Sequence, residues 1–116
     1  MNLAEEKRED DALRVEAIKS LYSTATQWEV RNAMERLSKE TRESEPIRVA
    51  ATLVLHAVNQ DWSVRNHLEE LAQRSPSVAL RTSAIKALQN GQSLELVRYF
   101  HLSYYLGRFI DPLEDQ

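Results

Sequence analysis

Apolar residues recur along the chain at the three- and four-residue intervals of an α-helix in six successive segments. No segment alternates apolar and polar residues over the length of a strand, and glycine occurs only at Gly91 and Gly107. The pattern therefore predicts an all-α chain of six helices that form three helix hairpins. The expected helices cover about residues 11–23, 26–39, 46–58, 61–73, 75–90 and 93–111.

Local capping signals support these helix starts and ends. Side chains of Asp, Ser and Thr can accept hydrogen bonds from the first free N–H groups of a helix, and proline is tolerated in the first turn. Such signals are Thr26 with Glu29, Pro46, Asp61, Ser75 with Pro76, and Ser93. Asn90-Gly91 and Asp111-Pro112 are expected to end the last two helices.

The length predicts one domain, because 116 residues are typical of a single folding unit and can bury a core without cross-links. Residues 1–10 are expected to form a charged N-terminal tail, and residues 111–116 a C-terminal tail. The domain between them divides into repeats of about residues 11–43, 44–74 and 75–110.

An apolar residue followed by arginine recurs at a nearly fixed spacing. The pairs are Leu13-Arg14, Val30-Arg31, Ile47-Arg48, Val64-Arg65, Leu80-Arg81 and Val97-Arg98. Successive arginines lie 17, 17, 17, 16 and 17 residues apart, and alternate copies resemble each other most, so the period is 34 residues and then 33. The segment beginning at Leu13 matches those beginning at Ile47 and Leu80, and Trp28 matches Trp62. Such a period indicates a repeat array, which usually provides a binding surface rather than a catalytic pocket.

Three segments carry a family resemblance over about residues 11–105. They are Pro46-Ile47-Arg48-Val49-Ala50-Ala51, Leu80-Arg81-Thr82-Ser83-Ala84-Ile85-Lys86-Ala87-Leu88, and Asp61-Trp62-Ser63-Val64-Arg65. The unit resembles a HEAT repeat, particularly the short bacterial type of phycobilisome-lyase-like HEAT proteins, and the last segment is similar to that family's Asp-x-x-Val-Arg pattern. A tetratricopeptide array has the same period, but its Trp-x-x-Leu-Gly-x-x-Tyr pattern is absent. The resemblance implies three hairpins stacked as a short right-handed α-solenoid, whose second helices line a concave surface commonly used for protein binding.

The repeated arginines favour a structural ladder. An arginine in the first turn of a helix faces the positive end of the helix dipole, so another contact must offset that repulsion. In stacked antiparallel helices it can donate to carbonyls at the end of the previous helix or to loop acids such as Asp61. The alternative is a basic track for phosphates or carboxylates, which nearby acids weaken. The expected ladder consists of Arg14, Arg31, Arg48, Arg65, Arg81 and Arg98.

The second helix of each of the first two repeats predicts an outward binding face. A helical wheel places Val30, Ala33, Met34 and Leu37 in the core and Trp28 roughly opposite. Tryptophan is enriched at binding hot spots, so repeated tryptophans on such faces are candidate anchors. The alternative is that each indole folds back over its own first turn. The candidate protein-binding residues here are Trp28, Asn32, Glu35, Trp62, Asn66 and Glu69.

The last helix adds a second candidate contact region. Its expected core face carries Val97, Phe100, His101 and Tyr104. Its opposite face should be polar in a terminal repeat but carries Tyr99, Leu102 and Leu106, which are therefore further protein-binding candidates. Two alternatives stay open, namely a homodimer through this helix and a tail that folds back to cover it. The tail residues concerned are Phe109, Ile110 and Leu113.

Composition narrows the function classes. The chain has no cysteine, a net charge of −3 and a sequence pI of about 5.6. The missing thiols exclude disulfides and thiolate metal sites, and the acidic balance argues against a general nucleic-acid binder. No apolar run reaches the ~18 residues that a membrane span needs, so no membrane association is expected. The N-terminus lacks a secretory signal pattern, and we expect a cytoplasmic location.

The sequence carries no recognisable catalytic pattern. His56, His67 and His101 are not at zinc-ligand spacing, and His101 is expected in the core. Glu69 and Glu70 are adjacent on a helix and diverge, so they cannot act as an acid–base pair. Two glycines could hardly form a phosphate-binding loop. We therefore expect no enzyme activity, no metal and no cofactor.

Taken together, these features predict a protein–protein interaction module, a small adaptor or assembly factor. It would bind a protein partner through the outward faces of the second helices and the aromatic C-terminal helix. One alternative is an accessory subunit of a bilin lyase-like or other enzyme complex. Another is nucleic-acid contact through the arginines, which the acidic charge balance disfavours.

Overall fold

The computed structural model describes residues 2–5, 10–91 and 93–100, and this part of the chain is all-α, with no strand. This confirms the prediction that the chain is all-α. The elements are α1 (Asn2–Glu5), α2 (Asp11–Ser20), η1 (Leu21–Thr24), α3 (Trp28–Lys39), α4 (Glu45–Val54), η2 (Leu55–Val58), α5 (Trp62–Arg74), α6 (Val78–Leu88) and α7 (Leu94–Tyr99). The expected helices 11–23 and 46–58 therefore each consist of an α-helix and a short 3₁₀ turn, η1 or η2.

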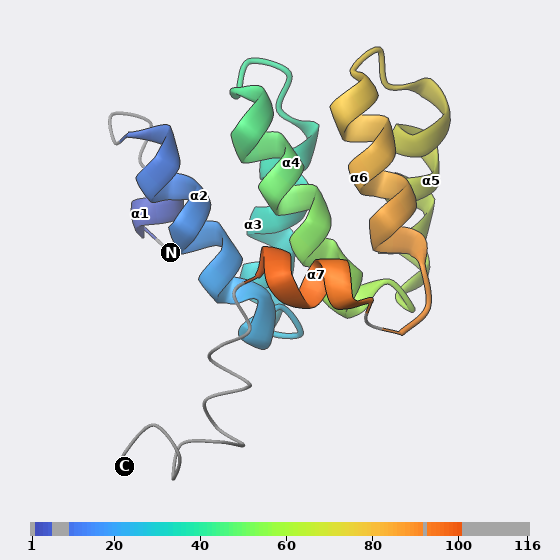
Figure 1. The fold of residues 1–116 in the computed structure, drawn as a ribbon, viewed down its shortest axis with the longest axis horizontal. Coiled ribbons are helices and arrows are strands. Elements are labelled where there is room, and N and C mark those ends of the chain that lie inside the picture. The colour runs from blue at the N-terminus through green and yellow to red at the C-terminus, as the bar shows by residue number, and fades with distance from the viewer. Residues whose placement is uncertain (1, 6–9, 92, 101–116) are drawn as a thin grey trace, which may run out of the picture.

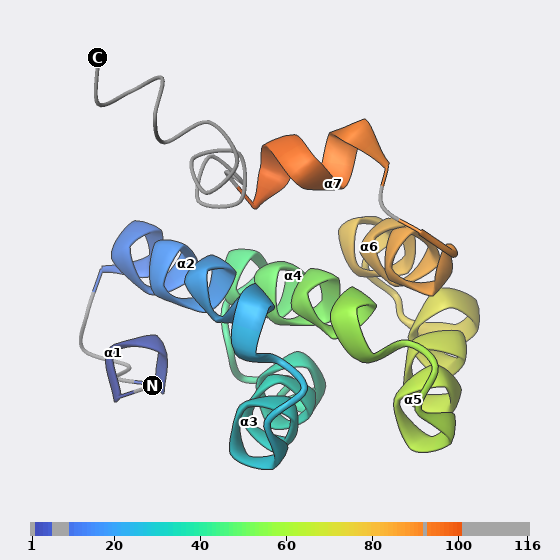
Figure 2. The ribbon, with the colours of Figure 1, turned by 90° about the horizontal axis from the view of Figure 1, so that it is seen from below.

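Three helices, α2, α4 and α6, lie side by side in one layer (Figure 1). Helices α3 and α5 lie on one side of this layer, and α7 lies on the other (Figure 2). Helix α3 packs along α4, and α5 packs along α6. These helix pairs thus straddle the predicted repeat boundaries.

The capping signals fixed some helix starts and missed others. Asp61 accepts hydrogen bonds from the backbone N–H groups of Ser63 and Val64, as expected of the cap of α5. Ser93 likewise caps α7, and Pro46 lies in the first turn of α4. The Thr26–Glu29 capping box is wrong, since α3 begins at Trp28 after Gln27, without a side-chain cap. Ser75 ends α5, and Ser77 caps α6 in its place.

Burial along the first helices shows that the three repeats are not equivalent. The buried stripe of α4 begins at Ile47, and that of α6 begins at the matching Leu80. In α2 the matching residue, Leu13, is 46 % exposed, whereas Ile47 is 0 % exposed. The stripe of α2 instead contains Arg14 and Ile18, one position later. Ile18 matches Thr52 of α4, which is also buried, so the two helices share this part of their register and differ at the first turn.

Arg14 occupies this inward position through a buried ion pair. Its two terminal nitrogens lie 2.9 and 3.0 Å from the carboxylate oxygens of Glu43, in bidentate geometry, and its Nε donates to the Ala4 carbonyl at 3.1 Å. The side chains of Arg14 and Glu43 are both buried. Glu43 belongs to the loop that follows α3. The pair ties α1, α2 and this loop together.

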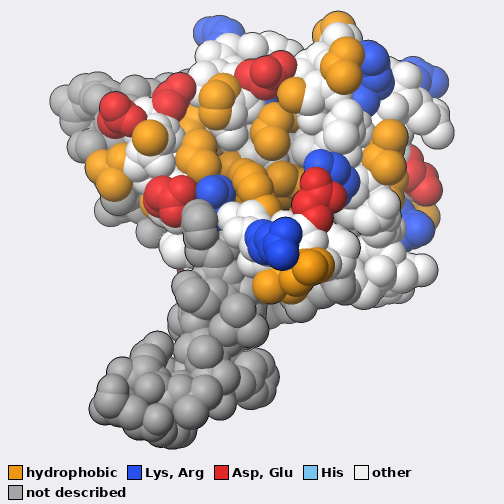
Figure 3. Space-filling model, in the orientation of Figure 1, with side chains coloured by type: hydrophobic (Ala, Val, Ile, Leu, Met, Phe, Trp, Pro, Cys, Tyr) orange, Lys and Arg blue, Asp and Glu red, His pale blue; other side chains and the backbone are white. Residues whose placement is uncertain are grey.

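Part of the predicted N-terminal tail is a helical turn packed on the domain. Ala4 of α1 is buried, and Glu5 forms an ion pair with Arg36 of α3. On the opposite side of the molecule, hydrophobic side chains gather near the centre of the face formed by α2, α4 and α6 (Figure 3). Partly buried residues such as Val15 and Val49 pack against the core beneath them.

Helix α7 does not repeat the positions of α3 and α5. Phe100, just after α7, is buried and stacks on Tyr22 of η1 with ring centroids 4.2 Å apart. Tyr99 meets the Phe100 ring edge-on, and the Lys19 ammonium lies 4.5 Å from the Tyr99 ring centroid. These aromatic contacts hold α7 across the first-helix layer, on the side opposite α3 and α5, so α7 does not take the place expected of the second helix of a third hairpin.

The aromatic contacts also correct the expected outward face of the last helix. Tyr99 packs against the core, and the prediction that it points outward was wrong. Burial, followed by the negative charge of Glu16, raises the pKa of its phenol to about 12. The other predicted positions of this region lie outside the described residues. They are His101, Leu102, Tyr104, Leu106, Phe109, Ile110, Leu113 and the helix end at Asp111-Pro112.

Equivalent positions in successive repeats are joined by a buried hydrogen-bond chain. Tyr22 and His56 are 34 residues apart, and the Tyr22 hydroxyl lies 2.8 Å from Nδ1 of His56. The other ring nitrogen, Nε2, lies 2.6 Å from the Gly91 carbonyl oxygen. Since a carbonyl can only accept, Nε2 of His56 donates to Gly91, and Nδ1 is the ring nitrogen that shares a hydrogen bond with the tyrosine hydroxyl. Gly91 has φ 71°, a left-handed conformation that glycine adopts without strain.

Candidate protein-binding surface

Two tryptophans dominate the exposed side of α3 and α5. Trp28 is the first residue of α3 and Trp62 the first residue of α5. They are 66 % and 77 % exposed, so neither indole is covered by its own helical turn. Leaving large apolar side chains in water forgoes the hydrophobic stabilisation that burial would give. Tryptophan is enriched at the hot spots of protein interfaces, so these two exposed indoles are candidate contact residues.

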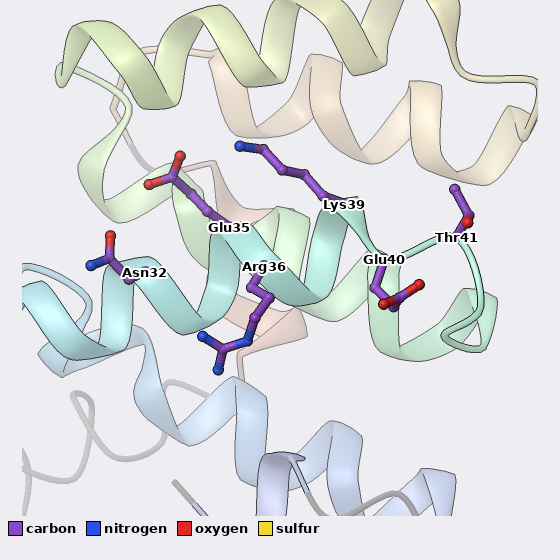
Figure 4. Close-up of a pocket in the computed structure, with 6 residues that line it drawn as sticks. All are labelled: Asn32, Glu35, Arg36, Lys39, Glu40 and Thr41. Carbon is purple, nitrogen blue, oxygen red and sulfur yellow. The ribbon is translucent and has the colours of Figure 1, made fainter.

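A shallow groove of about 510 Å³ lies along α3, on the C-terminal side of Trp28. Its lining residues are Asn32, Glu35, Arg36, Lys39, Glu40 and Thr41 (Figure 4). Glu35 and Lys39 point to the side of α3 on which α5 lies, whereas Arg36 points towards α1 and α2. The ion pair between Arg36 and Glu5 explains this second direction.

A second groove repeats the first on α5. It has a volume of about 290 Å³ and is lined by Asn66, Glu69, Glu70, Gln73 and Arg74. Adding 34 to the number of Asn32 gives Asn66, and adding 34 to that of Glu35 gives Glu69. The repeat therefore places the same two polar side chains beside each tryptophan. We call Trp28, Trp62 and the two grooves the α3–α5 surface.

The structure thus separates the predicted binding residues into three groups. Trp28, Asn32, Glu35, Trp62, Asn66 and Glu69 all belong to the α3–α5 surface. Tyr99 packs inward, and Leu102 and Leu106 lie outside the described residues. Sequence reasoning missed Lys39 and Arg74, although both follow the same helical faces one or two turns beyond the asparagines.

The repeated arginines contact the protein itself rather than forming one exposed track. Arg31 donates to the Asp61 carboxylate at 2.8 Å, the contact expected of a loop acid. Three others donate to backbone carbonyls of residues that precede the arginine's own helix. These bonds offset the repulsion between the arginine and the positive end of the helix dipole, as expected. These bonds are Arg48 to Ser38 at 3.1 Å, Arg65 to Asn59 at 3.3 Å and Arg81 to Ser75 at 2.7 Å. Arg14 is buried, and Arg98 is exposed on α7.

Asp61 both accepts the hydrogen bond from Arg31 and caps the start of α5. The Ser63 hydroxyl, followed by the backbone N–H of Val64, lowers the pKa of its carboxyl group, and the charge of Arg31 acts in the same direction. The carboxylate is therefore charged at neutral pH, and it fixes the start of α5 at Trp62. The position of the second indole depends on this cap.

His67 lies on the buried side of α5, next to the end of α3. Its Nε2 is 2.6 Å from the Ser38 hydroxyl, which itself donates to the Glu35 carbonyl. The imidazole Nε2 must therefore donate to this hydroxyl. Burial, followed by the charges of Lys39 and Arg48, lowers the pKa of His67 to about 4. The ring is neutral at pH 7.

This lowered pKa predicts a pH dependence of stability. Unfolded His67 takes up a proton near pH 6.5, but the folded ring takes it up only near pH 4. Between these values the unfolded state binds more protons, so the free energy of unfolding falls as the pH falls from 7 to 4. With solvent screening we expect a loss of about 1–2 kcal/mol from this group.

Urea unfolding of the natural chain and of His67→Gln, at several pH values, isolates that contribution. The glutamine amide can still donate to Ser38 but does not titrate. The stability difference between the two proteins should therefore shrink from pH 7 to pH 4. A difference that stays constant over this range would show that His67 is not held neutral.

Comparisons of the chain with protein-family models, with curated proteins and with solved structures found no match. Among the described residues, no three or more His, Asp or Glu side chains are grouped as a metal site would need. No helix in the same part of the chain has the length and apolar character of a membrane span. The α3–α5 surface is accordingly interpreted from its own residues and geometry.

Proposed function

We propose that this protein is a protein-interaction module, and that its α3–α5 surface holds a protein partner. The observation that carries the proposal is the pair of exposed tryptophans, Trp28 and Trp62, at equivalent repeat positions. Each tryptophan precedes by four residues an asparagine that lines a polar groove, so apolar anchors and hydrogen-bonding groups lie on the same helices. A small cytoplasmic adaptor or assembly factor fits these properties.

The proposed architecture is a short HEAT-like α-solenoid of the bacterial type. The repeat period, the side-by-side α2, α4 and α6, and the position of α3 and α5 on one side of that layer support it. In such an array each repeat adds one copy of the contact face. The two tryptophans and their grooves would then be successive copies of one binding unit.

Replacing both tryptophans by serine tests this function. We expect Trp28→Ser with Trp62→Ser to weaken partner binding at least 30-fold, roughly the effect of losing one binding hot spot of 2 kcal/mol or more. Because both indoles are exposed, we expect the free energy of unfolding to change by about 0.5 kcal/mol or less per site. Partners captured by the tagged natural chain in source cells would be purified, and their affinities for both proteins measured.

The matched control replaces two other exposed apolar residues, Val78 and Leu94, which are 66 % and 64 % exposed. Val78→Ser with Leu94→Ser should keep the partners and the affinity of the natural chain. Equal loss in both double variants would indicate non-specific adhesion. Unchanged binding after both tryptophans are removed would refute the proposed surface.

A further inference from the structure

A third hollow of about 470 Å³ lies between the C-terminal ends of α3 and α5. Lys39 and Thr41 line both this hollow and the α3 groove. Glu70 and Arg74 line both this hollow and the α5 groove. It therefore connects the two halves of the α3–α5 surface. Its volume is within the range of pockets that hold a small group.

Positive charge is concentrated in this hollow, although the chain as a whole carries −3. Lys39, Arg48 and Arg74 line it, with Glu70 as the acid among its lining residues. The Arg48 Nε is bound to the Ser38 carbonyl, which orients the guanidinium. Its two terminal nitrogens make no hydrogen bond to any described residue. We call Lys39, Arg48 and Arg74 the basic pocket.

The uncharged residues that line the hollow would strengthen the binding of a small charged group. His67 and Leu71 form part of its wall, with Pro76 beside them. His67 is engaged through Nε2 by Ser38, so Nδ1 is the ring nitrogen that remains to take up a proton. Apolar and buried neighbours reduce screening by water, which strengthens an ionic contact made there.

We propose that the basic pocket binds a carboxylate side chain of an acidic segment in the protein partner. This inference rests on the protein-binding function proposed above and adds the chemistry of the partner. Arginine suits it because a guanidinium can hold a carboxylate through two parallel hydrogen bonds. The tryptophans would supply apolar contacts at the N-terminal ends of α3 and α5, and the basic pocket at their C-terminal ends would select partners that carry an acid there.

A polyanionic nucleic acid fits this surface less well than a peptide. Glu35, Glu69 and Glu70 line the hollow or the adjoining grooves, and they would repel a continuous phosphate backbone. A peptide can place one carboxylate in the basic pocket and neutral residues beside these acids. Charge complementarity therefore favours an acidic peptide with spaced acids.

Fluorescence polarisation on the full chain tests the proposal. The probes are a labelled decapeptide of alternating Glu and Ser, the same peptide with Gln for Glu, and a single-stranded DNA decamer. We expect the Glu peptide to bind at low salt and the Gln peptide to bind at least ten times more weakly. Arg74→Gln should weaken the Glu peptide about tenfold. Arg98→Gln removes the same charge from α7, on the other side of the layer, and should have little effect.

Proton NMR of His67 adds a local readout. A carboxylate in the basic pocket would stabilise the protonated ring, so saturation with the Glu peptide should raise the pKa of His67 above its value of about 4. Absence of Glu-peptide binding, equal losses in Arg74→Gln and Arg98→Gln, or preference for DNA would each overturn the proposal. If Arg74→Gln keeps the natural partner while the double tryptophan variant loses it, the protein-binding function stands and this inference fails.

Discussion

Replacing Arg14 by methionine is expected to lower the free energy of unfolding by about 3–5 kcal/mol. The guanidinium is buried and bidentate with Glu43, and it also holds the Ala4 carbonyl. Methionine leaves the buried carboxylate without its closest compensating charge. Because small domains are stable by only about 5–15 kcal/mol, such a loss is readily measured by urea unfolding.

Two further variants separate the buried charge from simple loss of packing. Arg42 forms an exposed ion pair with Glu40 at 3.6 Å, so Arg42→Met should change stability by less than about 1 kcal/mol. In the double variant Arg14→Met with Glu43→Leu no charge of the pair remains, and much of the lost stability should return. A double variant no more stable than Arg14→Met would show that the pair acts mainly through its hydrogen bonds to neighbouring groups.

The second large effect concerns two residues that the repeat makes equivalent. Ile47→Ala should lower the free energy of unfolding by about 2–5 kcal/mol, because Ile47 is fully buried in the core. Leu13→Ala at the matching position of α2 should cost less than about 1 kcal/mol, since that side chain is half exposed. Chemical unfolding of both variants and the natural chain provides the comparison.

Leu80→Ala is the third member of this series. Leu80 is buried at the matching position of α6, so its replacement should behave like Ile47→Ala. The expected order is a large loss for α4 and α6 and a small loss for α2. Similar losses at all three sites would contradict the exposure of Leu13 in the structure.

The helices were predictable because their signals are local. Apolar spacing and the capping residues Asp61 and Ser93 depend on neighbours a few residues away, and the structure follows them closely. Even the approximate ends of α3 and α5, at Lys39 and Arg74, are within a residue of the expected ends. The 34-residue period also placed Trp28 and Trp62 at equivalent helix starts, where the structure has them.

Features that depend on contacts between distant segments were not predictable. Sequence similarity equated Arg14 with Arg48, but Arg14 is buried in an ion pair with Glu43, 29 residues away, whereas Arg48 binds the Ser38 carbonyl. The stacking of Phe100 on Tyr22 joins opposite ends of the chain, and it moves α7 away from the position that a third hairpin requires. A period can reveal repeated units without revealing how the terminal unit packs.

The candidate site was predictable only in part for the same reason. The helical wheel placed Trp28, Asn32 and Glu35 on one face, because that relation lies within a single helix. The basic pocket draws Lys39, Arg48 and Arg74 from three separate helices, and no spacing along the chain brings them together. Aromatic Tyr99 was assigned to the wrong face because the wheel assumed that α7 packs like α3 and α5.

The most direct test of the central claim is site-specific photo-crosslinking in source cells. A photoreactive phenylalanine analogue would replace Trp28, Trp62 or, as a control, Leu94 of α7, one position at a time. If the α3–α5 surface binds a protein, positions 28 and 62 should yield adducts with the same partner, and position 94 should not. Adducts from position 94 alone, or none from positions 28 and 62, would contradict the proposed binding surface.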